Sequence, residues 1–194
     1  MNRETVVAEA LNLLDEVGLD AVSTRRLAKR LGVEQPSLYW HFRTKNDLLA
    51  AMAAAAMEPH AAQALPEPGE DWHEWFLENT RSFRRTLLAR RDGARLHAGT
   101  TPAGDLDRIR RKMEFLVAAG VPAHDAGFAM LAAGRFTVGS VLEEQADPGV
   151  AGEMPADVPE FSHEQAFEAG LALILGGLEQ RVVAAAASTN TTAS

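Results

Sequence analysis

The sequence contains no cysteine. Disulfide scaffolds and zinc or iron–sulfur sites with cysteine ligands are therefore excluded, and the absence fits a reducing compartment. No apolar run reaches the roughly 20 residues that a membrane-spanning helix needs. The first 18 residues carry charges every few positions, unlike a signal peptide. We therefore expect a cytoplasmic protein with no membrane partner.

The sequence also lacks the strict alternation of apolar and polar residues that marks half-buried strands. Helical spacing dominates instead: Val6, Ala10, Leu13 and Val17 recur every three or four residues, which predicts an amphipathic helix over residues 3–17. Apolar residues make up 46% of the chain, enough for a substantial core. We therefore predict an all-α fold.

Capping residues and helix breakers divide the rest of the chain. Ser23 and Thr24 precede a short helix that ends at Gly32, and Thr44 with Asp47 resembles a capping box. Pro36 lies near the front of the short helix between them. Further helices are predicted at about 44–57, 72–89, 122–145 and 162–183, and another is predicted to end near residue 119. Residues 146–160 are expected to form a loop, and residues 184–194 a disordered tail.

Charge is distributed unevenly along the chain. The net charge is −8, which argues against DNA binding by the whole surface. Residues 21–46, however, hold six basic residues against Glu34 alone, a local net charge of +5. An acidic body with one basic face fits a DNA reader, because that face can neutralise phosphates while the body discourages indiscriminate adhesion.

Two short helices separated by the sequence GVEQ, after a supporting helix, predict a helix-turn-helix over residues 1–46. The front of its second helix would enter the major groove, where Gln35 can pair with an adenine edge and Arg25 with a guanine. Tyr39 and Trp40 could instead be ordinary packing residues. The DNA-contact candidates are Thr24, Arg25, Gln35, Pro36, Ser37, Tyr39, Trp40, His41 and Lys45.

The stretch TRRLAKRLGVEQPSLYWHFRTK resembles the DNA-binding domain of the TetR family of transcriptional regulators. The likeness continues through 82–102, 134–145 and 170–180, where it is to the tetracycline repressors of that family. It implies a homodimer on double-stranded palindromic operator DNA, with a ligand-binding and dimerisation domain over 47–183. Residues 171–178 are apolar almost all round, which independently favours an interface helix.

The resemblance also implies a ligand site. His97 would bind a Mg²⁺ that the drug chelates, while Thr100 and Glu143 would hold waters on the ion, which arrives with the ligand and is not a permanent cofactor. Asn79 and Phe83 lie four residues apart, on one helix face. Taken alone, these residues could equally be core or capping groups. The full set of ligand candidates is His60, Asn79, Phe83, His97, Thr100, Pro102, Lys112, Met130 and Glu143.

Three positions depart from the family's ligand site. Ala61 stands where a histidine is usual, although His60 is adjacent, and Thr101 replaces an arginine. Lys112 aligns with a glutamine, beside a one-residue gap around 103–106. A lost polar contact changes ligand discrimination, so the implied inducer is a tetracycline, a related polyketide or another chelating molecule.

These features together predict a repressor that a small-molecule inducer releases from its operator, with a role in antibiotic resistance. One alternative is a regulator of the same fold with an unrelated ligand, or an activator. Another is a helical metal-dependent hydrolase using His97 and Glu143. The sequence has no HExxH motif, which argues against that enzyme.

Overall fold

The computed structural model describes residues 2–100, 106–146 and 161–192, with side chains up to 188. All regular elements in these ranges are helical, as predicted. The chain forms two compact units, each described by itself below. Unit 1 comprises Met1–Gln63, Phe83–Ala103 and Val141–Ala146, and unit 2 comprises Ala64–Ser82, Gly104–Ser140 and Asp147–Ser194. The division therefore does not follow the boundary expected after residue 46.

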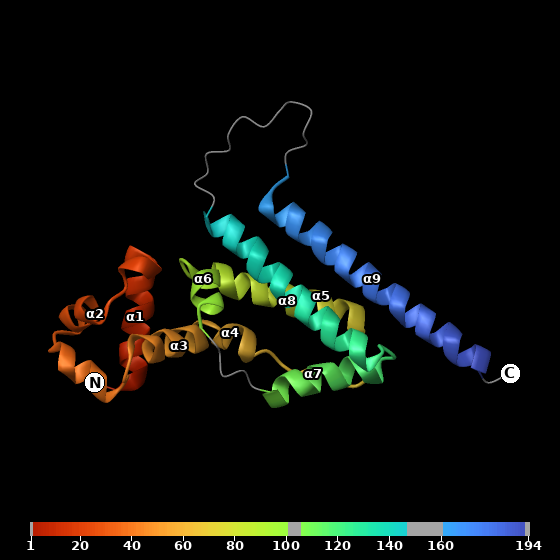
Figure 1. Ribbon diagram of the computed structural model, residues 1–194, viewed down its shortest axis with the longest axis horizontal. Coiled ribbons are helices and arrows are strands. Elements are labelled where there is room, and N and C mark those ends of the chain that lie inside the picture. Colours follow the sequence, from red (N-terminus) through yellow and green to blue (C-terminus); the bar gives the residue numbers. More distant parts are fainter. Residues whose placement is uncertain (1, 101–105, 147–160, 193–194) are drawn as a thin grey trace, which may run out of the picture. The chain divides into compact units, whose positions relative to one another are not determined.

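The helices follow one another along the chain as shown in Figure 1. They are α1 (Arg3–Val17), η1 (Leu19–Ala21), α2 (Thr24–Leu31), η2 (Gln35–Trp40), α3 (Lys45–Ala56), α4 (Glu58–Ala61), α5 (Trp72–Leu88), α6 (Gly93–Ala98), α7 (Leu106–Ala118), α8 (Ala123–Ala146) and α9 (His163–Thr192).

Three features differ from the sequence prediction. The second helix of the predicted helix-turn-helix is a 3-10 helix, η2. Helix α6 lies in a segment for which no helix was predicted. Helix α9 continues to Thr192 and does not end near residue 183, because residues 184–187 are all alanine, the strongest helix former. The predicted loop at 146–160 falls almost entirely outside the described residues.

The predicted caps shape the helix-turn-helix region of unit 1. Ser23 caps α2 by accepting a hydrogen bond from the Arg26 amide at 3.3 Å. Gly32 ends α2 with a φ of 66°, which glycine adopts at little cost. Thr44 and Asp47 form a reciprocal capping box at the start of α3. These local signals fix where α2 ends and α3 begins.

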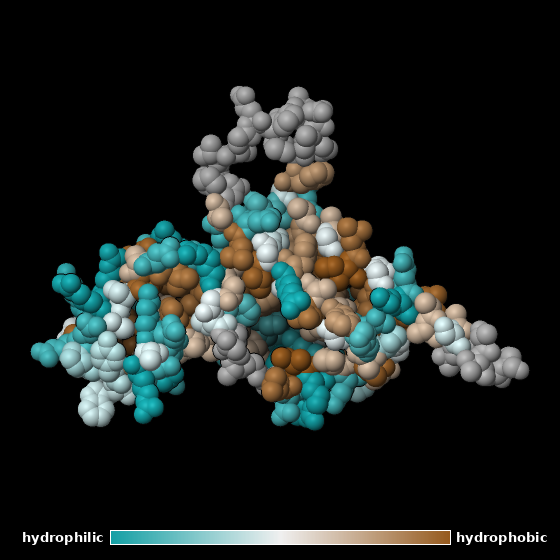
Figure 2. All heavy atoms as spheres, viewed as in Figure 1, coloured by the Kyte–Doolittle hydropathy of each residue, from teal (hydrophilic) through white to brown (hydrophobic). Residues whose placement is uncertain are grey.

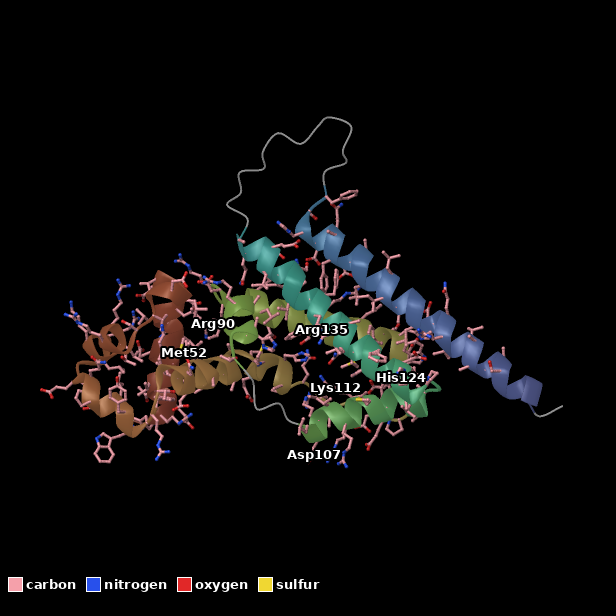
Figure 3. The ribbon with its side chains drawn as sticks, viewed as in Figure 1. Met52, Arg90, Asp107, Lys112, His124 and Arg135 are labelled. Atoms are coloured by element: carbon pink, nitrogen blue, oxygen red, sulfur yellow. The ribbon has the colours of Figure 1, made fainter. Side chains whose placement is uncertain are left out.

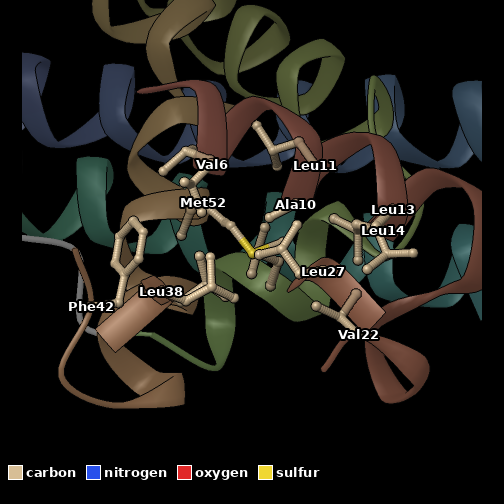
Figure 4. Close-up of a cluster of buried hydrophobic side chains, with 14 of the residues drawn as sticks. Val6, Ala10, Leu11, Leu13, Leu14, Val22, Leu27, Leu38, Phe42 and Met52 are labelled. Carbon is tan, nitrogen blue, oxygen red and sulfur yellow. The ribbon is translucent and has the colours of Figure 1, made fainter. Parts of the chain in front are cut away.

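The core of unit 1 gathers side chains from segments far apart in the sequence (Figure 4). Val6 and Leu14 of α1 pack with Leu27 of α2 and Met52 of α3, each at most 1% exposed. Leu96 of α6 belongs to the same cluster. Full burial of each such side chain contributes about 1.5–3 kcal/mol, so α6 is an integral part of this unit.

The core of unit 2 joins helices α5, α7, α8 and α9. Phe76, Leu116, Phe167 and Leu171 are at most 1% exposed. At Gly170 a Cβ atom would lie 2.4 Å from the Phe136 ring, so α9 approaches α8 closely at that point.

Helix α9 leaves much of its apolar surface uncovered. By length and composition alone, His163–Ser188 could cross a membrane, and one helix of this kind is weak evidence of a span. Glu168 and Glu179 interrupt its apolar sequence, which agrees with the prediction that no apolar run reaches the length of a span. Leu173 is 78% exposed, and on α8 Phe128 and Leu131 are also exposed. Figure 2 shows apolar surface, in brown, over α8 and α9.

Candidate functional site

The predicted DNA-reading residues lie on α2 and η2 of unit 1. The Gln35 side-chain amide donates to the Thr24 hydroxyl at 3.0 Å and approaches the Tyr39 hydroxyl at 3.4 Å. These contacts connect the front of α2 to η2 and restrain the Gln35 side chain. A restrained amide loses less conformational freedom when it pairs with a base edge.

Helix η2 turns one side chain into the core and several outward. Leu38 is 2% exposed, whereas Trp40 is 90% and Tyr39 is 49% exposed. The alternative that Trp40 is a packing residue of this unit is therefore wrong. Pro36 is also exposed, and Ser37 is half-buried.

The flanking candidates are also accessible. Arg25 and Lys45 are exposed, at the first turns of α2 and α3, and His41 is half-buried at the end of η2. The basic and aromatic candidates thus have the exposure that a nucleic-acid interface requires.

Arg3 fixes the end of η2, a role that the sequence did not reveal. Its guanidinium donates to the His41 carbonyl at 2.9 Å and lies 4.4 Å from the centroid of the Phe42 ring. Both partners are 38 or more residues away along the chain, so no local pattern signals the contact.

Helix α6 is tied to α1 and the turn after it by polar contacts. The Asp92 carboxylate accepts from the Leu19 amide at 2.7 Å. Arg90 pairs with Asp15 at 2.6 Å, and the Arg91 side chain donates to the Glu16 carbonyl at 3.0 Å. The charge-rich run from 90 to 95 is visible in the sequence, but its partners in α1 are not.

The metal-ligand candidate His97 lies on α6, among aromatic rings. The centroid of its imidazole ring lies 5.2 Å from the centroid of the Phe83 ring. The Phe83 centroid in turn lies 5.5 Å from that of the His60 ring. Unit 1 therefore brings these three predicted residues together. The His97 Nδ1 atom is buried and has no hydrogen-bond partner among the described residues.

Burial lowers the pKa of His97. Its imidazole is therefore neutral at pH 7, which is the form that binds metals. Thr100 lies one turn along the chain, and its hydroxyl oxygen is 3.2 Å from the carbonyls of both Leu96 and His97. Glu143 is exposed near the end of α8.

Within the described ranges, no group of three or more His, Cys, Asp or Glu side chains could hold a metal ion. A permanent ion needs several such ligands. A single histidine such as His97, whose buried Nδ1 has no hydrogen-bond partner among these residues, is compatible with an ion that takes most of its ligands from water and from a bound molecule.

Two more ligand candidates pair inside unit 2. Lys112 of α7 is 7% exposed, and its ammonium donates to the Asn79 side-chain oxygen of α5 at 2.6 Å. Figure 3 labels Lys112 on α7. Met130 is half-buried on α8 in the same unit. Thr101 and Pro102 lie outside the described residues.

Comparisons with known proteins match this chain to a family. A model described as "Bacterial regulatory proteins, tetR family" matches residues 6–52, and one described as "Tetracyclin repressor-like, C-terminal domain" matches 65–162. The Tetracycline repressor protein class C of Escherichia coli is 45% identical over 93% of this chain and 91% of its own length.

Solved structures agree with these matches. A TetR-family transcriptional regulator from Streptomyces coelicolor is 74% identical, with a TM-score of 0.75 over 93% of this chain and 96% of that one. The class A TetR in complex with 5a,6-anhydrotetracycline and magnesium is 47% identical, with a TM-score of 0.77 over 91% of this chain and 97% of that one. The chain therefore belongs to the TetR family of bacterial regulatory proteins.

Proposed function

We propose that the chain is a cytoplasmic transcriptional repressor that binds a palindromic operator as a homodimer. A small-molecule inducer, a tetracycline-like compound chelated to Mg²⁺, releases it from the DNA. The observation that carries this proposal is the outward-facing set of residues on η2, beside a basic α2, in a chain of this family. Because the family is one of transcriptional regulators, the hydrolase alternative with His97 and Glu143 is set aside.

The reading residues divide into two roles. Gln35 and Arg25 carry the hydrogen-bonding groups that distinguish base edges in the major groove. Thr24, Ser37, Tyr39 and Lys45 suit phosphates, which fix the register on the duplex without reading the sequence. Pro36, Trp40 and His41 complete the surface of η2 that meets the groove. The helix-turn-helix regions of the two protomers, about 34–36 Å apart, would occupy successive major grooves.

The uncovered faces of α8 and α9 support dimerisation. Leu131 and Leu173 are 46% and 78% exposed, and contiguous apolar surface of this kind marks an interaction site. A second copy would cover both helices with the same faces of its own, as a two-fold interface requires. A chain that runs as a dimer without detergent would support this arrangement over a membrane location for α9.

The proposed metal site uses the donors that the fold provides. His97 would be the direct protein ligand, and Thr100 and Glu143 would hold water molecules on the ion. When bound, Mg²⁺ links the oxygen atoms of a chelating inducer to the protein. Phe83 and His60 would contact the inducer beside His97.

Inducer binding at His97 can act on the helix-turn-helix region through α6. Asp92, Arg90 and Arg91 hold α6 against α1, and α1 supplies the core on which α2 and η2 rest. The inducer releases DNA only if it binds the DNA-binding arrangement of the protein and the released arrangement with different affinity. By linkage, operator DNA must then weaken inducer binding by the same factor.

A titration of operator binding tests the proposal. The purified chain is mixed with labelled duplex from the region upstream of its gene, and binding is followed by fluorescence anisotropy as 5a,6-anhydrotetracycline and Mg²⁺ are added. We expect release with both present, little release when EDTA removes the ion, and little release from His97→Ala. Unchanged DNA affinity at saturating inducer would remove the induction model, and no binding to any upstream duplex at low salt would remove the DNA-binding model.

A further inference from the structure

We propose that Arg3 is a further DNA-contacting residue, which binds a phosphate at the edge of the major groove that η2 enters. This inference rests on the proposed function, because it assumes that the chain binds duplex DNA. It adds a residue of α1 to a set of DNA-contact candidates that otherwise lies on α2, η2 and the start of α3. The same side chain would connect the DNA backbone to the end of η2.

Two contacts hold the Arg3 side chain against the end of η2. Its Nη1 atom donates to the His41 carbonyl at 2.9 Å, and its Cζ atom lies 4.4 Å from the centroid of the Phe42 ring. Phe42 is 4% exposed and belongs to the core of unit 1, so that ring is fixed in place. A guanidinium restrained in this way loses less conformational freedom when it binds a further partner.

The positive charge of Arg3 is left without a negative partner inside unit 1. In the part of the chain that the structure describes, its guanidinium bonds to the His41 carbonyl and forms no ion pair with a carboxylate. Neither a carbonyl nor an aromatic ring carries a net charge. The residue is exposed, and a guanidinium has five N–H donors. Its remaining donors suit a phosphate, whose oxygen atoms it can bind in pairs.

Arg30 of α2 shows the opposite arrangement. Its guanidinium lies 2.7 Å from the Glu9 carboxylate and 2.6 Å from that of Glu16, so two acidic side chains of α1 offset its charge. The basic segment 21–46 therefore contains a cation that is already paired within the protein. Arg3 lies outside that segment, yet its charge remains available to DNA.

The place of the contact on η2 favours a phosphate over a base. In helix-turn-helix proteins the front of the recognition helix contacts base edges, whereas His41 directly follows the last residue of η2. The far end of such a helix lies nearer the edge of the groove, where the sugar-phosphate backbone runs. Arg43 and Lys45 are exposed a few residues after His41. Positive groups in such a place suit phosphate contacts, which carry no sequence information.

The test is the salt dependence of DNA binding, because each phosphate contact releases counterions from the duplex. The full-length protein, Arg3→Gln and Arg3→Lys are titrated by fluorescence anisotropy against the upstream duplex and an unrelated duplex of the same length, at about 50 to 200 mM KCl. Arg111→Gln, at an exposed position on α7 in unit 2, is the control, because it removes the same charge. Circular dichroism and urea denaturation check that each variant folds.

We expect the plot of log K against log salt concentration to become less steep in Arg3→Gln. The change should be about 0.9 for each Arg3 side chain, or about 1.8 for a homodimer. Affinity for both duplexes should fall severalfold and by a similar factor, because every sequence presents the same phosphates. Arg3→Lys keeps the charge and should keep the slope. Arg111→Gln should keep both the slope and the affinity.

Three results would overturn the inference. One is an unchanged slope in Arg3→Gln. Another is weaker binding to the upstream duplex with full binding to the unrelated one, because Arg3 would then act only by holding η2. The third is an equal change of slope in Arg111→Gln, because total charge and not this contact would then set the slope.

The outcome is separable from that of the proposed function. A parent protein that binds the upstream duplex with a slope independent of Arg3 would overturn only the assignment to Arg3. A parent protein that binds no upstream duplex at low salt would remove the proposed function, and this inference with it.

Discussion

The Asp92 carboxylate accepts a hydrogen bond from the backbone amide of Leu19 at 2.7 Å. Asp92 also pairs with Arg95 at 3.1 Å and has a φ of 55°, in the left-handed region. One side chain thus connects the first turn of α6 to the turn after α1, and its backbone is in a conformation that most residues avoid.

Replacing Asp92 with Ala should therefore destabilise unit 1. The substitution removes the acceptor for the Leu19 amide, at a cost of about 1–3 kcal/mol, and puts alanine at a positive φ. We expect a lower urea midpoint and weaker operator binding. Asp92→Asn is the matched control, because asparagine tolerates the left-handed region and retains an acceptor oxygen. Equal stability of the Ala variant and the parent protein would contradict the prediction.

Gly93 should not tolerate any side chain. A Cβ atom there would lie 2.1 Å from the Leu87 carbonyl oxygen, and backbone must move to relieve that contact. We expect Gly93→Ala to reduce the free energy of unfolding by about 1–3 kcal/mol or more, measured by urea denaturation.

Gly127 provides the comparison for Gly93. Its added Cβ would meet only the flexible end of Met113, at 3.3 Å, and alanine is the better helix former. Gly127→Ala should be neutral or stabilising. A Gly93→Ala protein as stable as Gly127→Ala would show that the close contact is absent.

Trp40 should affect DNA binding and not stability. It is 90% exposed, so Trp40→Ala should change the free energy of unfolding by no more than about 0.5 kcal/mol. Operator affinity should fall severalfold or more in an anisotropy titration. Asn12→Ala, at an exposed position on α1, should leave affinity unchanged. Full operator affinity of the Trp40 variant would exclude this part of η2 from the interface.

The stability of the protein should depend on pH through His97. Its folded pKa is lowered by burial, so the unfolded chain takes up the proton first as pH falls. The contribution of His97 to stability is complete above the unfolded pKa of about 6.5 and is lost as pH falls through the folded pKa. Urea midpoints measured between pH 8 and 5 should therefore fall less steeply in His97→Gln than in the parent protein.

A second histidine controls for this effect. His124 is exposed on α8, so His124→Gln should retain the parent's pH dependence. If His97→Gln and the parent protein showed the same slope, burial of His97 would not shape the pH profile.

The sequence predicted the helices whose ends carry local signals. Ser23, Gly32 and the Thr44–Asp47 box all act where they were expected, because caps depend on residues only a few positions apart. It also predicted that Lys45 and Arg25 belong to one exposed basic face. The 3-10 geometry of η2 was missed, because a six-residue segment has too few residues to distinguish 3.0 from 3.6 residues per turn.

Contacts between distant segments could not be predicted. Nothing near Arg3 indicates that it reaches the His41 carbonyl, and nothing near Lys112 indicates its burial against Asn79. Such contacts depend on the tertiary packing of helices that are 33 or more positions apart. Resemblance named Lys112 as a candidate, but only the structure shows that it is buried and donates to Asn79.

Unit 1 is built from three segments that are separated along the chain. This limits how its DNA-binding part can be transferred to another protein. Its core includes Leu96, and the Gln145 side chain bonds to the Leu87 and Arg90 carbonyls from the far end of α8. A fragment cut after residue 63 would expose the face of α1 and α3 that α6 covers. The helix-turn-helix region therefore does not fold independently of the later segments. A chimera that transfers this region to another protein needs those segments as well.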